Sequence, residues 1–307
     1  MATVEREDER RPAPGAGERR TPNPQRATRP VRPVRPRSRF RRRGPFHILP
    51  VIGKSLRIWG SNFVTFQLVA LAAFLPLLAY SLWVSSARPD LRLSRGHQIL
   101  TGLGGNVLGM VVSAFVIYGV FKRLHGERPS LGKGLGHGLQ RLLPVIGVTI
   151  ISGLMIVAVM LLAMIPTMLL VAVAGALGGL KEELAVVLTL LVTAGVTGYV
   201  MAGLWVAVPV AVVERPQVSR SLSRSWFLTQ GFRMRILVPL VGLFMLEFGL
   251  ELGALLLIAD PGHAELVTLL GSSVLVSLQA VLAAVGYHEL RVAVEGAGVK
   301  QLAAVFD

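Results

Sequence analysis

The sequence contains no cysteine, which excludes disulfide bonds, thiolate metal sites and thiol-based catalysis. Charged residues are also scarce, at 16% of the 307 residues, whereas a soluble domain carries about 25%. Hydrophobic residues make up 52% instead. This balance argues against an ordinary soluble enzyme and indicates a polytopic membrane protein.

The signatures of common enzymes are missing as well. The sequence has neither a Gly-x-Ser-x-Gly nucleophile motif nor a His-Glu-x-x-His zinc motif. Gly53-Lys54-Ser55 resembles the end of a phosphate-binding loop, but that motif needs glycine at position 48, where Ile48 stands. Six histidines lack zinc-ligand spacing and are expected to be solvated in loops or flanks; they are His47, His97, His125, His137, His263 and His288. We therefore predict no enzymatic activity, no cofactor and no metal.

The basic residues are unevenly distributed along the chain. Residues 1–45 hold 14 of the 32 Lys and Arg but 5 of the 17 Asp and Glu. Because this segment is rich in Arg and Pro and poor in apolar residues, we expect a disordered cytoplasmic arm. Each basic residue beside an anionic leaflet contributes about 1 kcal/mol of binding. Contact with anionic lipid is therefore favoured over nucleic-acid binding.

Uncharged apolar runs long enough to cross about 30 Å of hydrocarbon as helices occur six times. They lie at about 63–84, 99–121, 142–164, 184–208, 236–258 and 266–286. We predict an all-α membrane domain with six spans over residues 46–307. The uncharged stretch 142–180 is too long for one upright span. It is either a tilted helix broken at Pro166 with an interfacial extension, or two short spans.

The distribution of Lys and Arg between the loops decides the topology. Six spans place 28 of these residues on one side of the membrane and 4 on the other. Dividing 142–180 into two spans would instead place loop 214–235, with five Arg, outside. The positive-inside rule therefore favours six spans with both termini in the cytoplasm. The expected location is a cell membrane, such as a bacterial inner membrane.

A short internal repeat precedes the odd-numbered spans. The heptads 50–56, 129–135 and 216–222 share the pattern Pro, any residue, aliphatic, Gly or Ser, Lys or Arg, Gly or Ser, Leu. Spacing of about four residues places the apolar side chains of the first and third copies on one helical face, away from the basic ones. Short basic amphipathic helices of this kind lie in the membrane interface. We predict a threefold repeat of an interfacial helix followed by two spans.

The repeat also suggests a ring of cations that binds anionic headgroups. Its candidate residues are Lys54, Arg57, Lys133, Arg220 and Arg224. The alternative is that these residues only follow the positive-inside rule.

Two motifs in the second half of the chain resemble a known family. The first runs from Trp205 through Pro209 to Glu214 and continues with Ser-Leu-Ser-Arg-Ser at 221–225, and the second is Tyr-His-Glu-Leu-Arg at 287–291. Both resemble the signature of the glycerophosphoryl diester phosphodiesterase membrane domain, over about residues 46–307. The motif residues are Pro209, Glu214, Ser225, Gly231, Arg291, Glu295 and Gly296. The resemblance implies a membrane region without assigned activity, since the catalytic motifs of the family's soluble barrel have no counterpart here.

A pair of acidic residues lies inside a predicted span. Glu247 is 11 residues into the 236–258 span, and Glu251 follows one turn later on the same face. A charged carboxylate near mid-bilayer costs roughly 2.5–3.5 kcal/mol, so we expect both to face the bundle interior. Their expected polar neighbours there include Gln67, Thr197, Tyr199 and Gln279. The pair is either a polar clamp between helices or a proton- or cation-responsive site.

Three functions follow from these features. The first is a non-enzymatic membrane protein that binds or organises lipid headgroups, a protein partner or a second copy of itself. The second is a transporter of small molecules or ions that uses Glu247 and Glu251. The third is an accessory role in glycerophosphodiester or lipid metabolism.

Overall fold

The structure is a computed structural model that describes residues 46–124, 131–176, 182–214 and 217–296. Over these ranges the chain is all-helical and contains no strand, as predicted. The chain divides into the units Met1–Arg41 and Arg42–Asp307, and every described residue belongs to the second unit. The predicted arm at 1–45 therefore lies outside the described residues, as do residues 297–307.

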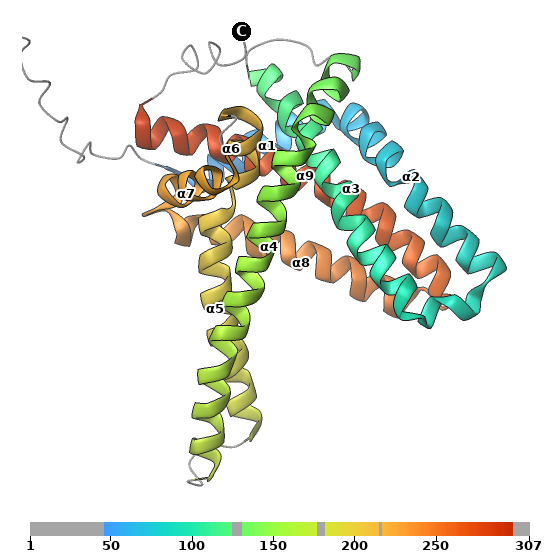
Figure 1. Cartoon of the computed structure of the whole chain (residues 1–307), viewed down its shortest axis with the longest axis vertical. Helices are drawn as coiled ribbons and strands as arrows, with labels where there is room; N and C mark the ends of the chain where they lie inside the picture. The colour runs from blue at the N-terminus through green and yellow to red at the C-terminus, as the bar shows by residue number, and fades with distance from the viewer. Residues whose placement is uncertain (1–45, 125–130, 177–181, 215–216, 297–307) are drawn as a thin grey trace, which may run out of the picture. The chain divides into compact units, whose positions relative to one another are not determined.

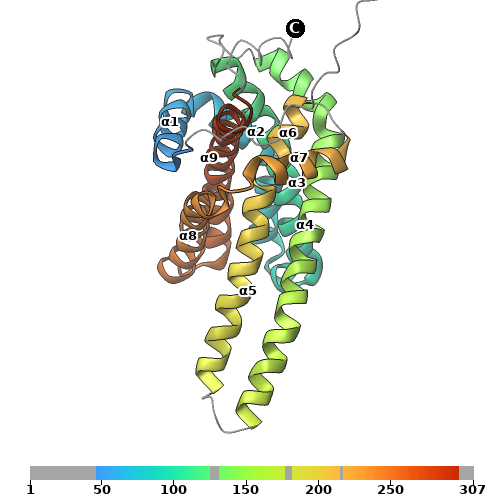
Figure 2. The ribbon, with the colours of Figure 1, turned by 90° about the vertical axis from the view of Figure 1, so that its left-hand side faces the viewer.

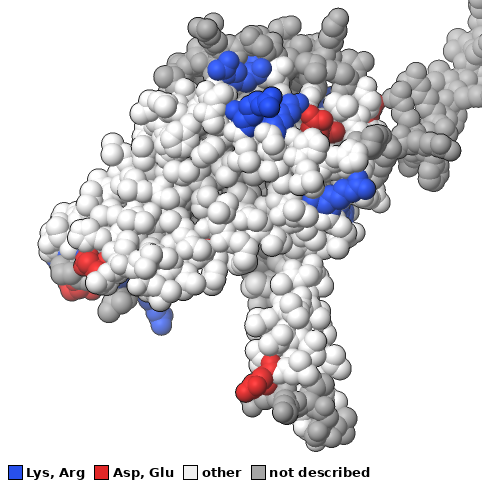
Figure 3. All heavy atoms as spheres, turned by 180° about the vertical axis from the view of Figure 1, so that it is seen from behind, with Lys and Arg blue, Asp and Glu red and all other residues white. Residues whose placement is uncertain are grey.

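In the described part of the chain, six helical segments are long and apolar enough to cross a membrane. They are α2 (Phe63–Ala87), α3 (Arg95–Leu124), the Leu143–Ala176 part of α4 (Leu131–Ala176), the Glu183–Glu214 segment formed by α5 (Glu182–Leu204) and α6 (Ala207–Glu214), α8 (Arg233–Leu257) and α9 (Pro261–Glu295). All six coincide with predicted spans, which supports a multi-pass membrane protein. Figure 3 shows one face of the molecule, on which Lys and Arg gather toward one end and a broad region without charged side chains lies beside them.

Helix α4 differs from the helix broken at Pro166 that the sequence suggests. It runs without interruption for 46 residues through both Pro144 and Pro166. The hydroxyl of Thr167 donates to the carbonyl of Ala163 at 2.9 Å, inside the turn that Pro166 disturbs. Because hydrocarbon offers no water to replace backbone hydrogen bonds, such side-chain bonds allow a membrane helix to continue past proline. The break at Pro166 was therefore a wrong prediction.

Short helices precede two of the spans. α1 (Ile48–Ser61) contains the first repeat copy and leads through Asn62 into α2, and α7 (Val218–Thr229) contains most of the third copy and precedes α8. The described part of the second copy instead forms the first turns of α4, with no separate helix there. The Asn62 side chain closes the junction between α1 and α2: its Nδ2 donates to Ile58 O at 2.8 Å, and its Oδ1 accepts from Arg123 Nε at 2.8 Å.

Helix α9 forms the centre of this unit. Helices α1, α2, α3 and α8 all pack against it, and its side chains Val281, Tyr287 and Leu290 are fully buried. Helices α4 and α5 pack against each other as a hairpin and extend beyond the helices around α9 (Figures 1 and 2). The hairpin exposes many large apolar side chains, such as Leu161, Leu169 and Leu190. Exposed leucines on a helix of this length suit contact with lipid rather than water.

Glycines allow the tryptophans to approach the helix backbones. A Cβ at Gly286 would collide with the ring of Trp205, and one at Gly203 would lie 2.6 Å from the ring of Trp226. Trp205 connects α5 to α6, so its contact with Gly286 joins this part of the chain to α9. Small residues at such contacts are typical of helix packing in membranes.

This contact predicts that Gly286→Ala destabilises the fold. The added methyl group overpacks the Trp205 contact, which costs about 1–3 kcal/mol of unfolding free energy. Gly242→Ala is the matched control, because a Cβ at Gly242 has no neighbour within 4 Å, and it gains up to about 1 kcal/mol of helix propensity. Unfolding in mixed micelles with a denaturing detergent measures both. Equal stability of the two variants would contradict the packing role of Gly286.

Candidate functional site

Three motif residues of the family resemblance, Glu214, Arg291 and Glu295, join Arg224 and Tyr287 in one ion-pair network between three helices. Glu214 ends α6, Arg224 lies in α7, and Tyr287, Arg291 and Glu295 lie along α9. Arg224 Nε lies 3.2 Å from Glu214 Oε2, and its Nη2 also pairs with Glu295. Arg291 Nε lies 2.9 Å from Glu295 Oε2. The Tyr287 hydroxyl donates to Glu214 Oε1 at 2.7 Å.

This network is balanced in charge, because two arginines face two glutamates. A group of side chains that already satisfy one another has little charge left to attract a ligand. Its geometry instead ties α6 and α7 to the last turns of α9. The network therefore has a structural role, which neither composition nor helical periodicity indicated.

The other motif residues also serve local structure. Pro209 is buried within α6, and the hydroxyl of Ser225 donates to Gly203 O at 2.8 Å. Gly231, with φ of 87°, turns the chain between α7 and α8, and Gly296, with φ of 64°, ends α9. Both φ values lie in the left-handed region that favours glycine.

The predicted headgroup-binding cations have different surroundings. Lys54 Nζ lies 2.7 Å from Glu289 Oε1, and Arg224 belongs to the network above. Arg57 and Arg220 are exposed, while the side chain of Lys133 lies outside the described residues. The ring of cations stays a prediction, and two of its members already have acidic partners.

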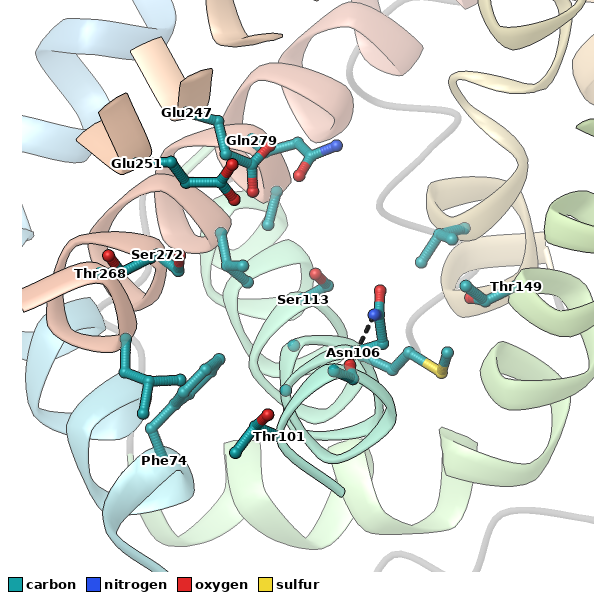
Figure 4. A pocket seen from close by; sticks show the side chains of 18 of the residues that line it. Phe74, Thr101, Asn106, Ser113, Thr149, Glu247, Glu251, Thr268, Ser272 and Gln279 are labelled. Atoms are coloured by element: carbon teal, nitrogen blue, oxygen red, sulfur yellow. Dashed lines mark hydrogen bonds between the residues drawn. The ribbon is translucent and has the colours of Figure 1, made fainter. Parts of the chain in front are cut away.

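Glu247 and Glu251 line a cavity of about 860 Å³ within the spans. Gln279 lines the same cavity, and Figure 4 shows it close to both carboxylates in that view. The other expected neighbours do not line it: Gln67 donates to Ser273 Oγ at 2.9 Å, and Tyr199 lies under the guanidinium of Arg233 at 4.5 Å. The two carboxylates thus line the cavity with Gln279 as a polar neighbour. Both side chains are exposed, so the expectation that they face the bundle interior stays a prediction.

The cavity extends along most of the bilayer thickness. Its lining on α3 runs from His97 to Ile117, and on α9 from Glu265 to Ala283. At 1.5 Å per residue these stretches measure about 27–30 Å, close to the thickness of the hydrocarbon core. Polar side chains occur along the whole length, several of them labelled in Figure 4; they are Arg92, His97, Gln98, Thr101, Asn106, Ser113, Thr149, Thr268 and Ser272.

Several buried polar atoms on the cavity wall have no hydrogen-bond partner among the described residues. They include Nδ1 of His97, a residue 5% exposed, and Nε1 of Trp205, a residue 8% exposed. Trp205 lies toward the same end of the spans as the ion-pair network, and His97 lies near the start of α3, toward the other end. Buried polar atoms normally have partners, so atoms of this kind are available to a ligand or to water.

The structure corrects the expectation that the histidines are solvated. His97 and His288 are each only 5% exposed, and His97 Nε2 lies 3.1 Å from Glu265 Oε1. The pairing joins α3 to α9 across a separation of 168 residues. The sequence carries no signal for it, because neither residue has a local partner. His263 does match the expectation, since its side chain is 77% exposed.

Comparison with known proteins adds no homologue: no family model, no curated protein and no solved structure matches this chain. The resemblance to the phosphodiesterase membrane domain therefore stays a prediction. Among the described residues, no cluster of three or more His, Asp or Glu could hold a metal ion. The functional candidate is thus the cavity, whose lining combines acidic, amide and hydroxyl groups with apolar ones.

The ion-pair network predicts a large effect of Glu214→Gln. The change weakens the bonds to Arg224 and Tyr287, and hydrogen bonds to charged groups contribute about 1.5–3 kcal/mol to stability. The control is Glu289→Gln, which breaks the more exposed pair with Lys54 and costs about 0–1 kcal/mol. Denaturing-detergent titrations of both variants measure the difference. A Glu214→Gln protein as stable as the control would show that the network does not hold α6 and α7 to α9.

Proposed function

We propose that this protein is a non-enzymatic integral membrane protein that binds the headgroup of a membrane lipid in the cavity lined by α3, α4, α8 and α9. The observation that carries the proposal is the position of Glu247 and Glu251. Both lie near the middle of an apolar span, and both line a cavity rather than a tightly packed interface. Carboxylates are costly at that depth, so polar residues there are a sign of a functional site.

Access to the cavity favours a lipid over a water-soluble ligand. The side chains of Glu247 and Glu251 are exposed although they lie within a span, which supports an opening of the cavity toward the bilayer. The neighbouring side chains Leu246 and Phe248 are about half exposed, at 55% and 51%. A molecule that occupies this opening meets apolar surface on one side and polar groups on the other. An amphiphile with its headgroup in the cavity and its chains in the bilayer satisfies both.

A transporter of small cations is the second candidate. The same acidic pair supports it, because carboxylates inside a membrane cavity attract cations. The two candidates differ in what fills the cavity in the purified protein: a lipid in the first, water and a small cation in the second.

The same proposal includes the orientation of the protein in the membrane. Both termini are cytoplasmic, and α1 and α7 lie in the cytoplasmic interface as two units of the predicted repeat. Support comes from the described cations at that end, which include Lys54, Arg123, Arg220 and Arg235, against Arg88, Arg92 and Arg95 at the other. The half-buried motif network lies at the cytoplasmic end in this orientation.

Reporter fusions test the orientation. A reporter after Asp307 or within 214–235 is expected to read cytoplasmic, and one near Lys181 or His263 external, because the positive-inside rule retains the basic loops. Alkaline phosphatase and green fluorescent protein fusions give opposite signals on the two sides. An external reading at 214–235 would exclude the six-span topology.

The amount of lipid that co-purifies with the protein tests whether the cavity binds lipid. Gly102 lines the cavity, and a Cβ there has no neighbour within 4 Å, so Gly102→Leu fills the cavity without a backbone clash. We expect roughly tenfold less co-purified lipid, which corresponds to a loss of about 1.4 kcal/mol in binding. Native mass spectrometry of the detergent-purified protein measures the bound lipid.

Gly242→Leu is the matched control for this measurement. Gly242 has the same free space for a side chain but lies on α8 outside the cavity lining. It should retain lipid as the unmodified protein does. Equal retention by Gly102→Leu and Gly242→Leu, or no bound lipid in the unmodified protein, would contradict the proposed function.

A further inference from the structure

We infer that the cavity carries the headgroup of a zwitterionic amine phospholipid from one leaflet to the other. This activity rests on the proposed function, because the lipid must first bind in the cavity. It goes further, since binding needs only one polar site, whereas movement across the bilayer needs a continuous path with suitable partners at each depth.

Contacts between the helices fix the depth of the polar groups. α3 and α9 run in the same direction, since His97 pairs with Glu265 near their first turns and a Cβ at Gly109 would lie 3.6 Å from Val276 further along. The separation in sequence is 168 residues at the first contact and 167 at the second, so the two helices keep one register. Residues of α3 therefore lie level with residues of α9 about 168 positions later.

This register arranges the lining in successive levels. Gln98 and Glu265 form the first level, Thr101 and Thr268 the second, and Asn106 lies near Ser272. Ser113 and Gln279 follow toward the cytoplasmic end. Along either helix, consecutive levels are separated by about 5–10 Å. Thr101, Thr268 and Asn106 donate to carbonyls of their own helices. Their side-chain oxygens remain as acceptors for an amine headgroup that leaves one level.

One residue of the acidic pair, Glu247, lies at the middle of this path. Leu250 of α8 contacts the position of Gly271 on α9, so Glu251 lies level with about residue 270, in the first third of α9. Glu247 lies one turn further toward the cytoplasmic end, since α8 runs antiparallel to α9. Measured from Glu265, these depths are about 8 Å and 14 Å. The cavity lining on α9 runs from Glu265 to Ala283, so Glu247 lies near its middle, where the barrier for a polar group is largest.

The charge of the lining selects the headgroup. Among the described residues that line the cavity, Arg92 is the single Lys or Arg, and it lies at the outer end. The centre thus offers acceptors for an ammonium group. Arg92 pairs with Asp260 and donates from Nη2 to Ser85 O, and its Nε, which has no partner among the described residues, is the donor for a phosphate. The unpartnered Trp205 Nε1 adds a donor toward the cytoplasmic end. Donors near both ends and acceptors at the centre match a headgroup that carries both a phosphate and an amine.

The experiment uses the full chain in liposomes with a trace of acyl-labelled fluorescent lipid. Dithionite destroys the label in the outer leaflet, so loss of the protected fraction reports movement from the inner leaflet. The probes are phosphatidylethanolamine, which has an amine, and phosphatidylglycerol, which has none. We expect the protein to move the amine lipid about tenfold faster than phosphatidylglycerol. The reason is that the loss of one ion contact lowers the affinity by about that factor.

The variants test whether the path runs through the cavity. The double variant Glu247→Gln and Glu251→Gln retains hydrogen bonding but removes the central charges, so it should slow the amine lipid about tenfold and remove the preference. Glu183→Gln is the matched control, because Glu183 does not line the cavity. Gly102→Leu, which fills the cavity, should slow both lipids while Gly242→Leu does not.

The outcomes separate this inference from the proposed function. Lipid retained in the cavity, together with no protein-dependent loss of protected label, would overturn the inference and leave the proposed function standing. Equal rates for both lipids, or an unchanged rate in the glutamine double variant, would also overturn it. If the unmodified protein retained no lipid, both the inference and the proposed function would be overturned. Size-exclusion profiles and the lipid retained by each variant show that a slow rate does not come from unfolding.

Discussion

The structure depends on one constraint: hydrocarbon provides no hydrogen-bond partner. Backbone groups in the spans must therefore bond within helices, and this keeps α4 intact through two prolines. Polar side chains in the same region need partners supplied by the protein itself. Thr167, Thr149 and Ser277 satisfy this need within their own helices by donating to backbone carbonyls. The remaining intramembrane polar groups lie at several separate places in the described part of the chain.

At two of these places, the need for hydrogen-bond partners is met in opposite ways. At the end of α9, two arginines and two glutamates neutralise each other, and Tyr287 adds a hydrogen bond to Glu214. Nothing in that network is left over for a ligand. In the cavity, by contrast, Glu247 and Glu251 have no basic partner within hydrogen-bonding distance among the described residues, and His97 and Trp205 each keep an unpaired nitrogen. The first arrangement stabilises the fold, and the second is suited to binding.

The difference also clarifies the family resemblance. Its motif residues form the closed network, the turn at Gly231 and the helix end at Gly296. These are structural tasks, so a chain can retain the motif without any particular activity. The residues proposed to bind lipid lie elsewhere, on α3, α8 and the first half of α9.

The sequence by itself determined the six spans and the presence of an acidic pair within one of them. Hydropathy and the cost of charge in hydrocarbon act on each segment locally, so they can be read from 20-residue windows. The pairing of His97 with Glu265, the convergence of Glu214 with Arg224, Arg291 and Glu295, and the cavity itself were decided by tertiary structure. These features join residues far apart in the chain through the register between helices, and that register is set by packing at glycines and aromatic rings rather than by any local pattern.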